Sequence, residues 1–578
     1  MAYHRFFQFG PFRLDASGRI LFRGNTPIPL PPKAVETLVF LVENAGAVMD
    51  KEQILKHIWK DAVVEEGSLT RTVCLLRKAL EQAENGQEYI TTVSKRGYRF
   101  VAEVTEAGMS RAQGDRLMLA VLPFDNISGD PKQDYFSDGL TEEMITQLSR
   151  LNPNRLGVIA RTSAMRYKGK GTEKSIREIG AELGVSHVLE GSVRRESGRV
   201  RIAAQLIQVA DETHVWAETY ERHLGDILKL QSEVSQAVAR EIRVKLTPRE
   251  ERRLSTVRMV PPAACEAYLQ GRHLWHKRTE DGMRKSIPFY EEAIRQYPEY
   301  AMAYAGIADS HVMLACRGMA PVKETFRKAK AAAMKALELD QELGDAQGSL
   351  AHVRLHDWDW DGLEEDFRRA IELNPAQAIV YYWFAEFLMS RSRPDEAIAL
   401  AERASDLDPL SPVIAASLGM ILYLARQYER ALSVMQRARE ITPDHFLPYL
   451  RIGYVCVQLK QHEEAIRALE TAVNLADRST ETLAALGLAY TAAGNDSQSR
   501  AILAELQKPV GAKRYVMPYN LARIYSISGN AEKAFEWLEI AYKEGNPDLI
   551  ELNSEPVFDP VRSDSRFSDL MRRVGWDV

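Results

Sequence analysis

The stretch of sequence that decides the amino-terminal fold is residues 68–80, SLTRTVCLLRKAL. Four of its apolar residues recur at spacings of four, three and four, which places them on one face of a helix. These residues are Leu69, Val73, Leu76 and Leu80. Because such a face must be buried, the stretch is predicted to be a helix that is anchored along its back.

The other side of this helix carries cations and hydroxyls. Its members are Thr70, Arg71, Cys74, Leu75 and Lys78, with Arg77 at the edge. Side chains of this kind suit phosphate oxygens and base edges, so these six residues are candidate DNA contacts. A basic helix on its own is more often a solvated surface, and the neighbouring segments have to decide between the two interpretations.

The segment that follows, residues 89–102, reads YITTVSKRGYRFVA and resembles a hairpin with a basic turn. Lys95 and Arg96 in that turn are further candidate DNA contacts. Tyr98 alternates with Arg99 and precedes an apolar residue, so core packing is favoured for it over a base contact.

The residues before the helix contain a regular order of elements. Residues 6–32 alternate short apolar pieces with turn signals, which predicts a small antiparallel sheet. Helices are predicted over residues 33–43 and 51–59, with Asp50 as an N-cap, followed by a loop over 60–67. The order sheet, helix, helix, loop, helix and hairpin, ending near Thr105, favours DNA binding over a solvated helix.

Composition limits the other possibilities. The chain has 578 residues, which suggests three or four structural units. It carries 75 basic and 80 acidic side chains, so no overall field draws it to nucleic acid or to a membrane. Residues 1–105 carry 14 Lys and Arg against 12 Asp and Glu, a modest excess for a DNA-binding module. Any affinity for DNA therefore has to be local.

The cysteines and the apolar runs give no sign of a metal site or a membrane segment. Cys74, Cys265, Cys316 and Cys456 are scattered without CxxC spacing, so neither a disulfide framework nor a zinc site is expected. The amino terminus lacks the apolar core of a secretion signal, and no run approaches the roughly 18 apolar residues of a membrane helix. We expect a cytoplasmic protein without a membrane partner, a metal or another cofactor.

A polar linker, residues 106–116, leads into a second domain over residues 117–246. The predicted elements alternate as in an α/β fold and then turn to strands. They are strands at 117–124 and 156–160, helices at 138–151 and 173–183, strands over 187–222 with a turn at 196–199, and a helix at 226–246. Residues 247–262 read as a second linker.

The rest of the chain repeats with a period of 34 residues. Alanines recur at this spacing, and a small residue stands nineteen positions before each of the last four, with a fifth small residue one period further on. The first set is Ala336, Ala370, Ala404, Ala438 and Ala472, and the second is Ala351, Ala385, Gly419, Gly453 and Gly487. We expect helical hairpins over residues 263–547, with nine extra residues around 317–323, and a capping segment at 548–578.

Signs of catalysis are weak. Residues 169–175, GKGTEKS, are similar to a phosphate loop, but Glu173 stands where a glycine is required. His462 and Glu463 begin a zinc-protease pattern that Ile466 ends. We do not expect an enzyme. Trp358 and Trp360, and the aromatic residues 381–384, can either pack a helical hairpin, which is favoured, or line a partner-binding platform.

Residues 6–102 resemble the OmpR-type winged helix in the variant found in CadC and ToxR. The motifs that carry the resemblance are LLRKAL at 75–80 and KRGYRFVA at 95–102. It implies that the third helix lies in the major groove and the hairpin in an adjacent minor groove. Arg71, Thr72 and Leu75 then fall at base-contacting positions, Arg77 at a phosphate and Arg96 at the wing tip.

No receiver domain precedes this region and no membrane span follows it, so control by phosphorelay or by a membrane tether is not expected. The second domain is similar to the TolB amino-terminal α/β module. The repeats resemble tetratricopeptide arrays, which implies a protein or peptide partner in a concave groove.

The sequence thus predicts a multidomain protein in which an α+β winged helix-turn-helix precedes an α/β module and an all-α tetratricopeptide solenoid. The hypothesis is a transcriptional regulator that binds double-stranded DNA, with a sensory or partner-binding remainder. One winged helix touches few base pairs, so a homodimer on paired half-sites is expected. The alternative is a scaffold protein in which the winged helix docks a protein.

Overall fold

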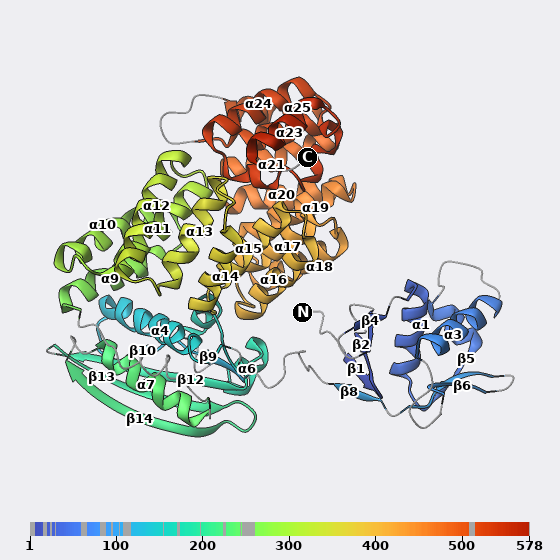
Figure 1. The fold of residues 1–578 in the computed structure, drawn as a ribbon, viewed down its shortest axis with the longest axis horizontal. Coiled ribbons are helices and arrows are strands. Elements are labelled where there is room, and N and C mark those ends of the chain that lie inside the picture. The colour runs from blue at the N-terminus through green and yellow to red at the C-terminus, as the bar shows by residue number, and fades with distance from the viewer. Residues whose placement is uncertain are drawn as a thin grey trace. The chain divides into compact units, whose positions relative to one another are not determined.

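The structure is a computed structural model, and its described residues lie between 6 and 576. They fall into two compact units, Met1–Asp115 and Arg116–Val578, each with its own hydrophobic core (Figure 1). The internal stretches outside the description are residues 16–19, 24–25, 29, 59–65, 81–87, 94–95, 103, 108–116, 154, 170–173, 197, 224–226, 243, 245–259 and 508–514. None of the described helices combines the length and the hydropathy needed to span a bilayer.

The first unit begins with an antiparallel sheet in the order β4-β3-β2-β1-β8. Its strands are β1 (Phe6–Phe9), β2 (Phe12–Asp15), β3 (Ile20–Arg23), β4 (Thr26–Ile28) and β8 (Thr105–Ala107). The sheet predicted for residues 6–32 is confirmed. The polar composition of residues 106–116 predicts a linker, but its first residues form β8, which pairs with the otherwise open edge of β1.

Three helices and a second sheet, in the order β5-β7-β6, complete this unit. The helices are α1 (Pro32–Glu43), α2 (Lys51–Ile58) and α3 (Glu66–Leu80), and the strands are β5 (Val48–Asp50), β6 (Ile90–Val93) and β7 (Gly97–Phe100). Helix α3 therefore begins two residues before the predicted start. A Cβ on Gly97 would lie 1.9 Å from the Met49 carbonyl oxygen, so the close pairing of β7 with β5 requires glycine.

The second unit contains a mixed sheet in the order β11-β9-β12-β13-β14, with β10 paired to β12. The strands are β9 (Leu117–Val121), β10 (Asp125–Asn126), β11 (Leu156–Val158), β12 (His187–Glu196), β13 (Arg199–Gln208) and β14 (Thr213–His223). The short turn between β12 and β13 confirms the hairpin predicted at residues 196–199.

Helices cover both faces of this sheet, which explains why β9 is apolar throughout. Leu119 and Val121 of β9 pack with α4 (Asp134–Ser149) and α7 (Ile227–Glu241). Met118 and Ala120 face the other way and pack with α6 (Ile176–Leu183). The predicted alternation of strands and helices is confirmed, although α4 begins four residues earlier than expected.

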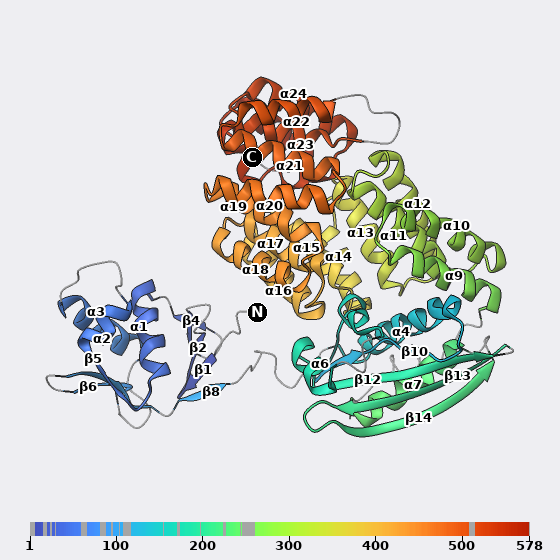
Figure 2. The same ribbon diagram turned by 180° about the vertical axis from the view of Figure 1, so that it is seen from behind.

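Paired helices α9 to α24 follow one another along the rest of the chain (Figures 1 and 2). The first helices of the units are α9 (Pro262–Trp275), α11 (Ala301–Cys316), α13 (Gly344–His356), α15 (Ala378–Ser390), α17 (Pro412–Leu424), α19 (Phe446–Gln458), α21 (Thr480–Ala492) and α23 (Pro518–Ile527). The second helices are α10 (Glu280–Gln296), α12 (Val322–Leu339), α14 (Leu363–Leu373), α16 (Pro394–Leu407), α18 (Tyr428–Ile441), α20 (His462–Leu475), α22 (Asp496–Gln507) and α24 (Ala531–Glu544).

The small residues that set the 34-residue period lie where two helices cross closely. A Cβ on Gly453 of α19 would lie 2.3 Å from Leu469 of α20. The nine extra residues of the long unit are not confined to residues 317–323. Compared with α15 and α16, helix α11 is three residues longer, α12 is four residues longer, and the turn between them has two more.

The α/β module and the repeats are one compact unit, whereas the sequence predicts two domains joined by a linker at 247–262. Leu140 of α4 and Tyr268 of α9 belong to the same core. A Cβ on Gly139 would lie 2.4 Å from a methyl carbon of Leu269, so α4 and α9 cross closely. Most of the predicted linker, residues 245–259, lies outside the described residues.

The carboxy-terminal segment does more than cap the last repeat. Helix α25 (Ser565–Val574) shares a core with α24, as predicted for a cap. The short turns η5 (Pro547–Glu551) and η6 (Pro556–Val561), however, pack against first helices of the array, η5 on α13 and α15 and η6 on α23. The array curves so that its second and last repeats meet, since a Cβ on Gly318 after α11 would lie 3.1 Å from Met517 before α23.

Candidate nucleic-acid interface and the unit that follows it

The structure anchors α3 by the face that the sequence predicts. Leu69, Val73, Leu76 and Leu80 are each at most 1% exposed. The residues opposite them are exposed, namely Thr70, Arg71, Cys74, Leu75 and Lys78. Thr72 is half-buried, and its hydroxyl donates a hydrogen bond to the Ser68 carbonyl oxygen within the helix at 2.9 Å. The predicted helix thus presents five of its candidate side chains to solvent on one rigid element.

Arg77, for which the resemblance implies a phosphate contact, makes hydrogen bonds to the hairpin. Its Nε and Nη2 atoms donate to the Ile90 carbonyl oxygen at 2.9 and 2.8 Å, and Nη2 also donates to Thr92 Oγ1 at 2.9 Å. Glu88 lies 3.4 Å away from Nε. The side chain therefore ties α3 to strand β6, and it positions the hairpin relative to the helix.

The hairpin formed by β6 and β7 carries exposed cations. Arg96 is exposed in the turn between the strands, and its N–H donates to the Val93 carbonyl oxygen at 3.1 Å. Lys95 lies outside the described residues. Tyr98 is 4% exposed, which confirms the prediction that it packs in the core. Arg99 is an exposed residue of β7 that was not a candidate, although the alternation around Tyr98 indicates its orientation.

In the second unit, buried charges join the α/β module to the first repeats. Glu142 of α4 accepts hydrogen bonds from Arg272 and from His276 Nε2, the latter at 2.7 Å. Arg272 Nη1 also donates to Asp309 Oδ2 of α11 at 3.2 Å. Burial alone would raise the pKa of the Glu142 carboxyl, but Arg272 and His276 hold that pKa well below its usual range. The charges are paired, as buried charges must be.

A second contact lies between the module and the fourth repeat. After β11, the Ala160 N–H donates to the Leu407 carbonyl oxygen at 2.7 Å. The Ser163 N–H and hydroxyl both donate to Asp408 Oδ1, at 2.8 and 2.6 Å. Burial raises the pKa of Asp408, and these hydrogen bonds oppose that change. Two separate contacts thus fix the module against the array.

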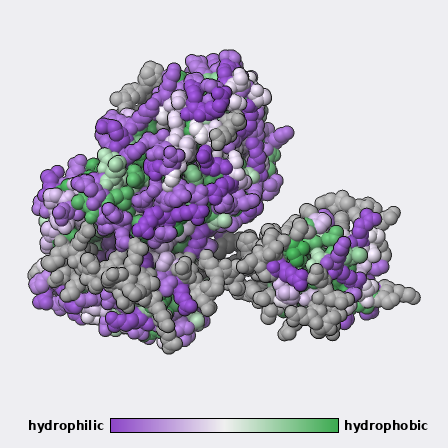
Figure 3. Space-filling view, viewed as in Figure 1, coloured by the Kyte–Doolittle hydropathy of each residue, from purple (hydrophilic) through white to green (hydrophobic). Residues whose placement is uncertain are grey.

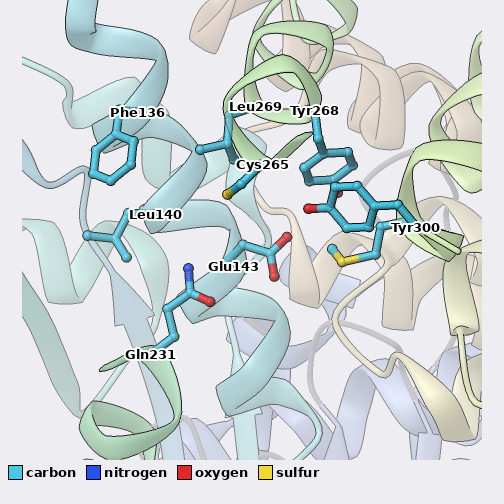
Figure 4. Close-up of a pocket in the computed structure, with 9 residues that line it drawn as sticks. Phe136, Leu140, Glu143, Gln231, Cys265, Tyr268, Leu269 and Tyr300 are labelled. Atoms are coloured by element: carbon cyan, nitrogen blue, oxygen red, sulfur yellow. The ribbon is translucent and has the colours of Figure 1, made fainter. Parts of the chain in front are cut away.

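A small pocket lies where α4, α7 and the start of the array meet (Figure 4). Glu143 is surrounded there by Cys265, Tyr268 and Tyr300. Burial, and then the charge of Glu142, raise the pKa of the Glu143 carboxyl to about 7. The cavity has a volume of about 10 Å³, which is the space of a single water molecule rather than of an effector.

The carboxy-terminal segment is held on the array by polar and aromatic contacts. Glu555 is fully buried, with Oε1 accepting a hydrogen bond from the Tyr423 hydroxyl at 2.6 Å and Oε2 lying 2.8 Å from Arg523 Nη2. Trp360 Nε1 donates to the Val574 carbonyl oxygen at 3.0 Å, and the Trp358 ring stacks on Tyr542 of α24, in the last repeat. The prediction that these indoles pack rather than form an open platform is confirmed.

The aromatic residues 381–384 are likewise mostly internal. Tyr381, Trp383 and Phe384 are each at most 7% exposed, and Tyr382 is partly buried against the same core. On the face drawn in Figure 3, the described surface of the second unit is mostly hydrophilic. Three of these four aromatic side chains therefore pack in the core.

Comparison with known proteins agrees with this architecture. Residues 25–100 match the family of transcriptional regulatory protein C-terminal domains, and residues 115–237 match the second domain of HilA/YgeH-like transcriptional regulators. Residues 364–412 match the tetratricopeptide repeat, and residues 390–472 match subunit 3 of the anaphase-promoting complex. The second domain is thus similar to a regulator domain, where the sequence alone suggests a TolB-like module.

Two curated relatives and one solved structure are among the similar proteins. The transcriptional regulator HilA of Salmonella typhimurium is 25% identical over 395 residues, which is 68% of each chain. "Putative adenylate cyclase 3" of Rhizobium meliloti is 49% identical over 154 residues, 27% of this chain and 26% of its own length. The DNA-binding domain of Escherichia coli CadC is 27% identical, with 18% of this chain and 99% of that one covered and a TM-score of 0.17.

The matches together span the winged helix, the middle domain and part of the repeats. The chain therefore joins a winged-helix domain of the OmpR and CadC type to a HilA-like second domain and a tetratricopeptide repeat array.

Proposed function

We propose that this chain is a sequence-specific DNA-binding transcriptional regulator of the cytoplasm. Helix α3 lies in the major groove, and the β6–β7 hairpin reaches an adjacent minor groove. The observation that carries the proposal is the exposed face of α3, with Arg71 and Lys78 opposite a fully buried apolar face. The names of HilA and CadC, both regulators, support the same function.

The nine candidate contacts divide by their surroundings. Arg71, Thr70, Cys74 and Leu75 are proposed to face base edges, because they occupy the exposed centre of the helix. Lys78, Lys95 and Arg96 are proposed phosphate contacts. Thr72 and Arg77 are proposed to act mainly by shaping the site, because both make hydrogen bonds inside the unit.

The second unit is proposed to sense a partner and to make DNA binding conditional. Because the α/β module and the array share a core and several polar contacts, a ligand bound to either changes the stability of the whole unit. A protein or peptide partner would bind on the array. Two copies of the chain on paired half-sites would supply the specificity that one winged helix lacks.

The experiment begins with the promoters that crosslink to the full chain in cells. Binding to a recovered promoter is then measured over a range of salt concentrations. We expect Arg71→Ala to cost about 1–3 kcal/mol and to relax specificity at one base pair. Lys78→Ala should instead weaken binding to all DNA sequences by the same factor. It should also lower the slope of the logarithm of the binding constant against the logarithm of the salt concentration by about one. Arg23→Ala, an exposed cation on β3, is the control.

Absent or salt-insensitive binding, with both α3 variants unchanged, would overturn the proposal. Crosslinking that recovers proteins but no discrete promoters would support the scaffold alternative instead. Light scattering of the complex with the promoter tests whether two copies of the chain bind one DNA. A single chain per DNA would contradict the proposed dimer.

A further inference from the structure

Four potential metal ligands meet where three successive first helices of the array lie side by side. Cys316 ends α11, His352 and His356 lie on α13, and Glu386 lies on α15. The spacing of four puts both histidines on one face of α13. The sequence gives no sign of this group, because its members come from three helices and share no short motif.

Donor atoms of Cys316, His352 and His356 lie close enough together for a single metal ion, and Glu386 lies on the Nε2 side of His352, whereas Cys316 lies on its Nδ1 side. His352 Nε2 lies 3.1 Å from His356 Nε2 and 4.0 Å from Glu386 Oε2. Cys316 Sγ lies 3.9 Å from His352 Nδ1. With one atom taken from each of Cys316, His352 and His356, all three lie within 4.8 Å of one another. Tetrahedral zinc, with bonds of about 2.0–2.3 Å, holds its ligand atoms roughly 3.3–3.7 Å apart.

The histidine rings are already held in place by their surroundings. His356 Nδ1 lies 3.1 Å from the Pro547 carbonyl oxygen, which can only accept a hydrogen bond. The proton of a neutral His356 is therefore on Nδ1, and Nε2 is free of it and directed at His352. The His352 ring stacks on Trp383 at 4.1 Å, and the His356 ring stacks on Phe326 at 5.4 Å. Both histidines are buried, at 3% and 8% exposed.

Glu386 supplies the observation that points to a cation. Its Oε2 atom is buried and has no hydrogen-bond partner among the described residues. Burial raises the pKa of the Glu386 carboxyl to about 8, and the unpartnered oxygen lies 4.0 Å from His352 Nε2. A divalent cation would satisfy it. With one thiolate, one carboxylate and two neutral imidazoles, the loaded site would carry no net charge.

We propose that Cys316, His352 and His356 bind one divalent transition-metal ion of the zinc class, with the Glu386 carboxyl beside them. Binding replaces the thiol proton of Cys316 with a metal–sulfur bond and releases that proton to solvent. His356 also makes a hydrogen bond to the Pro547 carbonyl oxygen at the start of η5. The bound ion would therefore help to hold the carboxy-terminal segment on α13. A ligand set of two nitrogens and one sulfur suits zinc better than magnesium or calcium.

The test uses the full chain, stripped of metal with a chelator and titrated with Co²⁺ as a spectroscopic probe. We expect one equivalent to bind, with the visible bands of tetrahedral Co²⁺ and a thiolate-to-cobalt charge-transfer band, and Zn²⁺ to displace it. Cys316→Ser should abolish the charge-transfer band. His352→Gln and His356→Gln should each weaken binding more than about tenfold, since even partners of metal ligands cost that much.

Matched controls come from the same array. Cys456→Ser removes another thiol, and His462→Gln removes another imidazole, and both should bind Co²⁺ as the unaltered chain does. Chelation of the unaltered chain should also speed hydrogen exchange at residues 547–551, which needs no variant to fold. Substoichiometric binding without a charge-transfer band, or equal binding after His352→Gln, would overturn the proposal and leave the four side chains as a hydrogen-bonded cluster. DNA binding by the first unit is measured separately.

Discussion

Glu555→Gln tests how the carboxy-terminal segment is held on the array. Glu555 is fully buried, and its partner Arg523 is 4% exposed. Glutamine has nearly the same size and still offers an oxygen to the Tyr423 hydroxyl. It removes the charge that lies 2.8 Å from Arg523, however, and leaves a buried guanidinium against the Tyr454 ring without its carboxylate. The variant therefore changes one interaction while it preserves the packing.

Removing one partner of a buried ion pair costs about 3–5 kcal/mol, because the remaining charge stays desolvated. At about 1.4 kcal/mol for each factor of ten, the segment should open roughly a hundred to a few thousand times more often. The pair between Arg426 and Asp559 is the matched control. Its atoms lie 2.7 Å apart, but its side chains are 45% and 43% exposed. Asp559→Asn should therefore cost less than about 1 kcal/mol.

The assay is hydrogen exchange followed by mass spectrometry on residues 547–576 of the full chain. Glu555→Gln should lose protection there, and Asp559→Asn should lose little. Adding Arg523→Met to Glu555→Gln should restore part of the protection, because the uncompensated charge is then gone. Equal and small losses in both single variants would refute the argument, since they would mean that Glu555 is solvated.

Three further predictions concern the two units. Arg77→Ala should lower the free energy of unfolding of the first unit by about 2 kcal/mol, measured by urea denaturation, because it removes the link between α3 and β6. Ser163→Ala should destabilise the second unit by about 2 kcal/mol in thermal unfolding, because the buried Asp408 loses the hydrogen bond that the Ser163 hydroxyl donates. An unchanged unfolding temperature would show that this contact does not hold the module on the array. Glu143→Gln should stabilise the second unit at about pH 8 by about 3 kcal/mol and by less as the pH falls toward 4.5. The pKa of this acid is raised to about 7 in the folded state, so ionising it costs stability as the pH rises between those values; a gain that does not vary with pH would refute this.

Periodicity in the sequence predicts local structure well and predicts contacts between distant elements poorly. The spacing of Leu69, Val73, Leu76 and Leu80 predicts α3, because burying one helical face requires that spacing. The resemblance implies a phosphate contact for Arg77, whereas the hydrogen bond of its Nε atom in the structure runs to strand β6. Spacing along the helix does not show this contact, because a side chain at the edge of a helix can turn toward a neighbouring strand. Strand β8 is missed because its three residues, Thr105, Glu106 and Ala107, have no strand pattern of their own and gain strand character only from pairing with β1.

By itself, the sequence determined the winged helix, the alternation of the middle domain and the 34-residue period, since each follows from which side of a local element is apolar. Only the tertiary structure decided that the middle domain and the repeats form one unit. It also decided that the carboxy-terminal segment packs on the first helix of several repeats, namely α13, α15 and α23. It also decided that Cys316, His352, His356 and Glu386 meet. These contacts depend on the crossing angles and superhelical twist accumulated over many helices, and no short stretch of sequence records that sum.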